Sequence, residues 1–161
     1  MISFVFIATP PFVKGVNVGR ARSAGIEFTA EADLTDTLTA SVNYTYTDSE
    51  NLATDRPLPR EPRHRWNLGL TWQPVARLSL FSQVHVVSEQ FEPTGGGNGV
   101  YNSGHTRVDV GGSYRLVTRY ALLQALDLTA RIQNVLNEGY AEVRGFPALG
   151  INALVGLRAS F

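Results

Sequence analysis

Apolar and polar residues alternate strictly through several stretches of the sequence, and this alternation restricts the possible folds more than any other feature. From Thr37 to Thr47 every even-numbered residue is Leu, Ala, Val or Tyr, and every odd-numbered residue is Thr, Ser or Asn. Successive side chains of a strand point to opposite faces, whereas a helix places its apolar residues three and four positions apart. The stretch is therefore predicted to form a β-strand with one apolar face and one polar face.

The same period of two predicts about eight strands along the chain. Pro10-Pro11 ends the first, because two prolines remove two hydrogen-bond donors. A helical turn and a plain connection both stay open for Val117 to Gln124, and we expect the connection. The predicted strands are Met1 to Thr9, Gly25 to Leu34, Thr37 to Thr47, Arg63 to Gln73, Arg77 to Ser88, His105 to Leu116, Ala125 to Gln133 and Ile151 to Phe161.

The connections between these strands alternate between short and long. A tight turn at Thr35-Asp36 and another at Pro74-Val75-Ala76 contrast with long polar loops at Asp48 to Pro62, Glu89 to Gly104 and Asn134 to Leu149. The strands run to about 10 to 12 residues, close to the 9 to 11 that a tilted membrane-spanning strand needs. These features predict an all-β, antiparallel transmembrane β-barrel of meandering strands. A soluble β-sandwich, with the apolar face in its core, stays open as the alternative.

The last predicted strand stops on an aromatic residue, Phe161. Termini left in water fray, whereas an amphipathic ring is stabilised at the headgroup depth of a membrane. We therefore expect Phe161 to end a transmembrane strand and to serve as a C-terminal signal for membrane assembly. Further aromatic residues lie near strand ends, as in the girdles of membrane barrels. They are Tyr44, Tyr46, Trp66, Trp72 and Tyr114.

The composition excludes several classes of protein. Cysteine is absent, which excludes disulfide frameworks and thiolate metal sites. Fourteen basic and fourteen acidic residues cancel, so no basic excess suggests a nucleic-acid partner. No stretch approaches the roughly 18 to 20 apolar residues of a membrane helix. Met1 to Ala8 lacks the basic residues and cleavage site of a secretory signal, so we expect either a mature form or a piece of a longer protein.

Catalytic, metal and cofactor motifs were sought in the same sequence. His64, His85 and His105 do not stand at metal-ligand spacing. Gly95 to Gly99 lacks the lysine and the following Ser or Thr of a phosphate-binding loop. No set of nucleophile, base and orienting residue is evident. We predict no catalysis, no cofactor and no metal site.

Two of the long loops carry candidate ligand-binding residues. Arg56 and Arg60 lie in the first, where guanidinium groups match the oxygens of phosphates and other anions. Tyr101 and Asn102 lie in the second. We assign these four residues to ligand binding at the outer loops, and lipopolysaccharide phosphates are a further anionic partner. A simply solvated loop stays open as the plainer explanation.

Several short motifs, taken in order, resemble the C-terminal part of TonB-dependent outer-membrane receptors. The order and spacing are most similar to the vitamin B12 (cobalamin) branch, with siderophore receptors next, and the similarity runs from about Phe12 to the end of the chain. The motifs are Asn17 to Glu27, Tyr44 to Asp48, Leu58 to His64 and Arg131 to Asn137, followed by Tyr140, Gly145 and the strand that ends in Phe161.

This resemblance implies a barrel of about 22 strands in the bacterial outer membrane, closed by an N-terminal plug domain. Such a receptor imports a scarce nutrient, cobalamin or a ferric siderophore, with energy from the inner-membrane TonB complex. The plug, the TonB box and most strands have no counterpart here, so residues 1–161 are expected to be a C-terminal barrel segment. The implied partners are the rest of the receptor, outer-membrane lipid, the barrel assembly machinery and, through the missing N-terminal part, TonB.

An isolated wall of this kind would expose unpaired backbone groups in hydrocarbon, at several kcal/mol for each group. The strands are therefore completed by missing sequence or by another chain, or they close on themselves as an autonomous eight-stranded barrel with a structural or adhesive role. In either case charged residues recur on the polar face. We expect them to pair across strands, and contact with a plug or an anionic ligand is the alternative. They are Arg63, Arg65, Arg107, Asp109, Arg115, Asp127, Arg131 and Arg158.

Overall fold

The structure is a computed structural model, and it describes residues 2–6, 13–17, 19–94, 99–120 and 122–161. The predicted break at Pro10-Pro11, the glycines 95–97 and the ends of the predicted strand Met1 to Thr9 lie outside these residues. Within them every regular element is a strand. The described residues include no helix that is long and apolar enough to cross a membrane.

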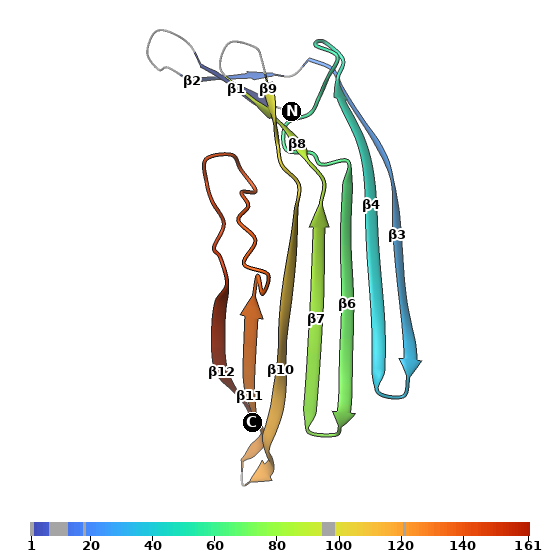
Figure 1. The fold of residues 1–161 in the computed structure, drawn as a ribbon, viewed down its shortest axis with the longest axis vertical. Helices are drawn as coiled ribbons and strands as arrows, with labels where there is room; N and C mark the ends of the chain where they lie inside the picture. The colour runs from blue at the N-terminus through green and yellow to red at the C-terminus, as the bar shows by residue number, and fades with distance from the viewer. Residues whose placement is uncertain (1, 7–12, 18, 95–98, 121) are drawn as a thin grey trace.

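Seven long strands form one antiparallel meander in which each strand pairs with the neighbours along the chain (Figure 1). In spatial order they are β3 (Ala21–Thr35), β4 (Leu38–Asn51), β6 (His64–Val75), β7 (Leu78–Val87), β10 (His105–Tyr120), β11 (Leu123–Gln133) and β12 (Asn152–Ser160). The two-residue β5 (Arg56–Pro57) adds to β4. Two small ribbons stand apart, β1 (Ile2–Phe6) with β2 (Val13–Asn17) and β8 (Gln90–Pro93) with β9 (Gly99–Asn102).

The seven predicted strands from Gly25 onward are confirmed, with differences at their ends. The remaining predicted strand, Met1 to Thr9, overlaps β1, which pairs with β2 and not with the meander. Both the helical turn and the expected plain connection for residues 117–124 are wrong, because β10 runs on to Tyr120 and β11 begins at Leu123, its partner in register. A register shift between Arg115 and Val117 accommodates this extension.

The predicted alternation of short and long connections is confirmed. Short turns join β3 to β4, β6 to β7 and β10 to β11 at one end of the sheet, here called the short-turn end, where the C-terminus also lies (Figure 1). The long connections lie at the opposite end, here called the outer end. Two of them are more ordered than predicted, because β4 continues to Asn51 and pairs with β5, and the second loop contains the β8–β9 ribbon.

The register gives the sheet two chemically different faces. One row across five strands is apolar, and the next row toward the outer end is polar, as the period of two predicts. The apolar face is defined by the row Ala30, Val42, Leu68, Val84 and Val108. The polar face is defined by the row Thr29, Asn43, Asn67, His85 and Arg107.

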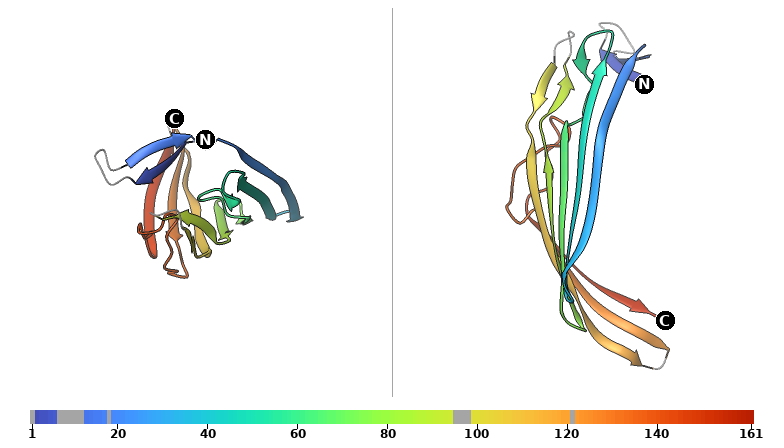
Figure 2. Two further views of the ribbon diagram at one scale, coloured as in Figure 1. Left: turned by 90° about the horizontal axis from the view of Figure 1, so that it is seen from above. Right: turned by 90° about the vertical axis from the view of Figure 1, so that its right-hand side faces the viewer.

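Burial is inverted relative to a soluble protein. Leu68 is 42% exposed and Val155 is 76% exposed, whereas Asp109 and Asn134 are 0% and 1% exposed. Among the described residues Leu58 is the one large aliphatic side chain that is buried. The right-hand view of Figure 2 shows the long strands as a single bent layer. The soluble β-sandwich is therefore wrong, because the apolar residues do not meet in a dry core between two sheets.

The sheet is open within the described residues. β3 pairs only with β4, and β12 pairs only with β11, so each leaves one edge without a partner strand. Closure of the wall into a barrel would require a partner for each of these two edges.

Candidate functional site

The apolar face carries aromatic residues at two levels. Trp66 and Trp72 lie on this face of β6, separated by six residues, which is about 20 Å of strand. That height is close to the apolar band of about 25 Å in membrane barrels. At the upper level the rings of Tyr44 and Trp66 stack at 4.0 Å between centroids, and the Tyr44 hydroxyl lies 2.8 Å from His64 Nδ1. Such a cluster of amphipathic rings is typical of the girdles that membrane barrels carry at the lipid–water boundary.

The polar face carries cross-strand ion pairs for part of the predicted set, whereas Arg65 and Arg158 form no salt bridge with another described residue. Arg115 donates two hydrogen bonds to Asp127, at 2.8 and 3.3 Å. Asp109 accepts a bond of 2.6 Å from Arg131 Nη2 on β11, and Nε of Arg107, on the same strand as Asp109, lies 3.2 Å from its other oxygen. Pairing of this kind allows charged groups to line a confined space.

Asp109 also fixes the base of the third long loop, between β11 and β12. Its carboxylate accepts a hydrogen bond of 3.0 Å from the backbone N–H of Asn134, whose φ is 52°. The Asn134 amide donates to the carbonyl oxygens of Glu138 at 2.9 Å and Leu149 at 3.2 Å, and its oxygen accepts from the Glu138 N–H at 3.0 Å. Sequence reasoning missed this network. The asparagine directly after a strand was the available signal, because Asn tolerates positive φ and bonds to nearby backbone.

Glu92 joins the three long connections at the outer end. Its side chain is almost completely buried, and its two oxygens accept hydrogen bonds from Arg60 Nε at 3.1 and 3.2 Å. The backbone N–H of Arg144 also donates to Glu92, at 3.4 Å. Arg60 belongs to the first loop, Glu92 to the ribbon and Arg144 to the third loop, so one carboxylate ties all three together.

Two further side chains of the ribbon hold the third loop by its backbone. Gln90 Nε2 donates to the carbonyl oxygen of Glu142, and Asn102 Nδ2 donates to that of Ala141 at 2.6 Å. The rings of His105 and Tyr140 stack at 4.0 Å between centroids. Buried polar side chains therefore set the positions of these loops, in place of an apolar core.

The structure brings three of the four predicted ligand-binding residues to the ribbon. Arg60 is paired with Glu92, and Asn102 is bonded to the third loop, so both side chains hold loops together. Tyr101 is 58% exposed and meets Phe91 edge to face at 6.0 Å. Arg56 is half-buried in β5, opposite Asn51.

Two other predicted features have clear positions. Phe161 follows β12 at the short-turn end and is 81% exposed. No group of three or more His, Asp or Glu side chains among the described residues is arranged to hold a metal ion.

Comparison with known proteins shows which family the chain matches. A family model described as "TonB dependent receptor-like, beta-barrel" matches residues 1–135. An iron-regulated outer membrane virulence protein of Vibrio cholerae is 29% identical over 161 residues, an alignment that covers 96% of this chain and 23% of that protein.

Solved structures agree on the fold. The copper transporter OprC superposes with a TM-score of 0.79 at 22% identity, covering 99% of this chain and 26% of that one. A mutant of the ferric enterobactin receptor PfeA of Pseudomonas aeruginosa gives 0.73 at 24% identity, covering 98% and 26%. The chain spans about a quarter of the length of these proteins.

The family match covers most of the chain, and the solved receptors share its antiparallel sheet. The two-faced, coreless sheet is the arrangement that a membrane barrel wall requires. The chain therefore belongs to the TonB-dependent receptor-like β-barrel family, whose place is the bacterial outer membrane.

Proposed function

We propose that the chain is the C-terminal barrel segment of a receptor that imports a ferric siderophore. The observation that carries this proposal is the match of residues 1–135 to the TonB-dependent receptor barrel family. The exposed apolar face and the buried polar residues of the sheet agree with it. Proteins similar to the chain are named as an iron-regulated outer membrane protein, a ferric enterobactin receptor and a copper transporter. Their names favour a metal-bearing cargo. Cobalamin is the second candidate, on the order and spacing of the sequence motifs.

In this proposal the rest of the receptor supplies what the segment lacks. Further strands cover the free edges of β3 and β12 and close a barrel of about 22 strands, because unpaired backbone groups in lipid are costly. A plug domain occupies the interior, and an N-terminal segment outside residues 1–161 contacts TonB for energy. The segment itself carries no catalytic step.

Cargo capture is assigned to the outer end. The exposed ring of Tyr101 offers a stacking surface, and Arg56 offers a guanidinium to an anionic siderophore. Arg60 and Asn102 contribute by holding the loops in the binding arrangement, through Glu92 and Ala141.

Membrane contacts complete the proposal. The exposed ring of Phe161 is the recognition element for the barrel assembly machinery, and lipopolysaccharide surrounds the outer end of the apolar face. The autonomous eight-stranded barrel is the competing hypothesis. It is tested by refolding residues 1–161 alone in detergent, because only a closed barrel would show heat-modifiable migration.

The test of transport uses the full-length receptor in a strain that lacks its own siderophore receptors. We expect uptake of radioactive iron from ferric enterobactin that exceeds uptake of labelled cyanocobalamin and is lost when TonB is deleted. Uptake of cyanocobalamin alone would transfer the assignment to the second candidate. Absence of TonB-dependent uptake of either probe would overturn the proposal.

A further inference from the structure

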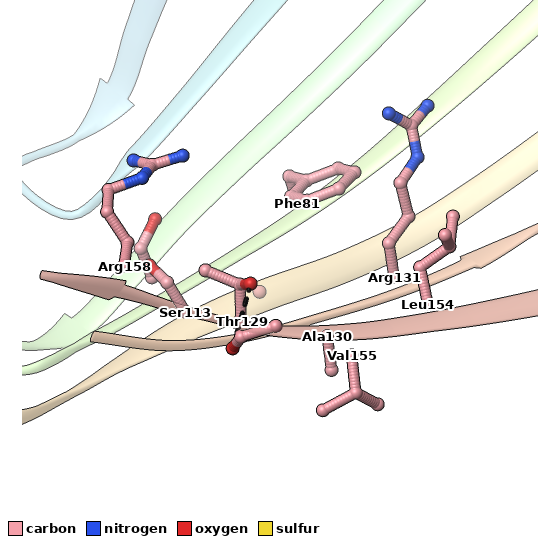
Figure 3. A pocket seen from close by; sticks show the side chains of 11 residues that line it. Phe81, Ser113, Thr129, Ala130, Arg131, Leu154, Val155 and Arg158 are labelled. Atoms are coloured by element: carbon pink, nitrogen blue, oxygen red, sulfur yellow. Dashed lines mark hydrogen bonds between the residues drawn. The ribbon is translucent and has the colours of Figure 1, made fainter. Parts of the chain in front are cut away.

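Two hollows lie on opposite faces of the sheet. The larger, of about 410 Å³, opens on the polar face, and Figure 3 shows Arg131 and Arg158 on that side with Ala130 and Val155 on the opposite side. The smaller, of about 350 Å³, crosses β3, β4 and β6 and is here called the lipid-side hollow. The side chains of the apolar face that line it are Ala30, Ala32, Ala40, Val42, Leu68 and Leu70.

Small side chains create the lipid-side hollow. Ala30 and Ala32 are successive residues of the apolar face of β3, and on that face they stand between the larger Phe28 and Leu34. On β6 the hollow is bordered by Leu68. An empty space of this kind forfeits dispersion contacts with its lining, so in a bilayer it is filled by hydrocarbon.

Charged residues gather on the same face toward the outer end of β3 and β4. By the period of two, Arg22, Asp48 and Glu50 belong to the face that carries Tyr46. Arg22 Nη2 lies 3.6 Å from an oxygen of Asp48 and 3.4 Å from one of Glu50. Arg63, directly before β6, reaches the other oxygen of Asp48 at 3.4 Å. These ion pairs therefore lie beyond the ring of Tyr46, on the water side of the aromatic girdle.

This group of charges retains capacity to bind an anion. The side chains of Arg22 and Arg63 are 61% and 65% exposed. Exposed ion pairs contribute little net stability, so their arginines can exchange a carboxylate for a phosphate, whose oxygens match the guanidinium geometry. Arg20, two residues before Arg22, forms no salt bridge with another described residue. Three guanidinium groups therefore stand against the carboxylates of Asp48 and Glu50, and we call these five residues the ionic cluster.

The height between the ionic cluster and the lipid-side hollow suits one lipid molecule. Asp48 and Val42 are separated by six residues of β4, which is about 20 Å along the strand. At the usual tilt of membrane barrel strands this corresponds to about 15 Å of height. That is half of the roughly 30 Å of hydrocarbon in a bilayer. A lipid whose head lies at the cluster therefore reaches the hollow with its hydrocarbon chains.

The occupant must carry both phosphate and hydrocarbon, and it must lie in the leaflet at the outer end. We propose that the ionic cluster and the lipid-side hollow form one binding site for a molecule of lipopolysaccharide. A phosphate of its lipid part binds Arg22 and Arg63, and one hydrocarbon chain fills the hollow beside Ala32 and Leu68.

This inference rests on the proposed function, in which lipopolysaccharide surrounds the outer end of the apolar face. It adds that one such molecule is held at a particular place on β3, β4 and β6. A bound molecule of this kind stays with the receptor when the surrounding lipid is exchanged for detergent.

The experiment measures the lipopolysaccharide that stays bound to the full-length receptor after purification in mild detergent, by native mass spectrometry. We expect about one molecule per receptor. The double variant Arg22→Gln with Arg63→Gln should retain about tenfold less, and the double variant with lysine at both positions should retain most of it, because lysine still binds phosphate as a point charge. The matched control is Arg144→Gln, at an exposed position of the third loop, and it should retain the wild-type amount.

A second pair of variants tests the hollow. Ala32→Phe fills it with an apolar ring, which the lipid-facing surface tolerates, and should lower the retained amount several-fold. Ala153→Phe puts the same ring on the apolar face of β12, outside the hollow, and should leave the amount unchanged. Heat-modifiable migration confirms that each variant is folded.

Four outcomes would overturn the inference. They are a wild-type receptor that retains no lipid, one that retains phospholipid in place of lipopolysaccharide, equal retention by the wild type and the glutamine double variant, and equal retention by Ala32→Phe and Ala153→Phe. Iron uptake is measured separately. A failed transport assay with the expected lipid retention would count against the proposed function alone, and normal transport without bound lipopolysaccharide would count against this inference alone.

Discussion

The wall of the sheet and the loops at its outer end are stabilised in different ways. In the wall, polar contacts follow the register, as between Arg115 and Asp127, which are direct partners on β10 and β11. At the outer end, contacts join segments that are distant along the chain, as between Gln90 and Glu142. Polar contacts in the wall therefore follow from the pairing of neighbouring strands, whereas those at the outer end depend on a few particular side chains. Substitutions in the two regions should differ accordingly.

The largest effect is expected where the two regions meet, at Asp109. Asp109→Ala removes the acceptor of Arg131 and of the Asn134 N–H, and it leaves buried donors without a partner. We expect a loss of about 3 kcal/mol or more in the free energy of unfolding, measured by denaturant titration of the full-length receptor in detergent. Asp127→Ala is the control in the wall and should cost clearly less, because its pair is more exposed. Equal losses for both variants would show that the junction has no special role.

The next effect concerns the difference between the apolar and the polar face of the wall. Leu68→Arg puts a charge in the middle of the apolar face and should destabilise the folded receptor by about 2 to 4 kcal/mol. Asn67→Arg, one residue earlier on the polar face, should be far better tolerated. Both are compared by denaturant titration in detergent and by the amount of receptor in outer membranes. If the two variants behaved alike, the assignment of faces would fail.

A smaller and local effect is expected at Glu92. Glu92→Gln weakens the charge-assisted bonds to Arg60 by about 1 to 2 kcal/mol, and all three long connections should loosen together. Limited proteolysis should then cut the first and third loops several times faster, while the strands stay protected. Glu89→Gln, at an exposed position of the same connection, is the matched control. Faster cleavage of one loop alone would contradict the coupling through Glu92.

The smallest effect tests the girdle. Tyr44→Phe removes the hydroxyl that bonds to His64 and should cost about 0.5 to 1.5 kcal/mol, since the ring still stacks on Trp66. Tyr46→Phe, at the neighbouring position of the same face, should cost less. Denaturant titration of both variants measures the difference in the free energy of unfolding. A larger loss for Tyr46→Phe would contradict the stabilising role given to the Tyr44 hydroxyl.

Sequence reasoning reached the candidate site only in part. Arg56, Arg60, Tyr101 and Asn102 lie at the outer end, because they fall in long connections of an alternating pattern, and their role in ligand binding stays a prediction. The partners of Arg60 and Asn102 were not predictable, since Glu92 and Ala141 lie 32 and 39 residues further along the chain. No periodicity links such positions, and many other pairings would have fitted the same loops equally well.

The sequence by itself determined the strands, their two faces and the order of short and long connections. Those features follow from a geometric period of two that each strand carries in its own residues. The tertiary structure decided the extension of β10 to Tyr120, the β8–β9 ribbon, the burial of Asp109 and Asn134 and the tie through Glu92. Each of these depends on which distant groups come within hydrogen-bonding distance, and that is set only when neighbouring strands fix one another in register.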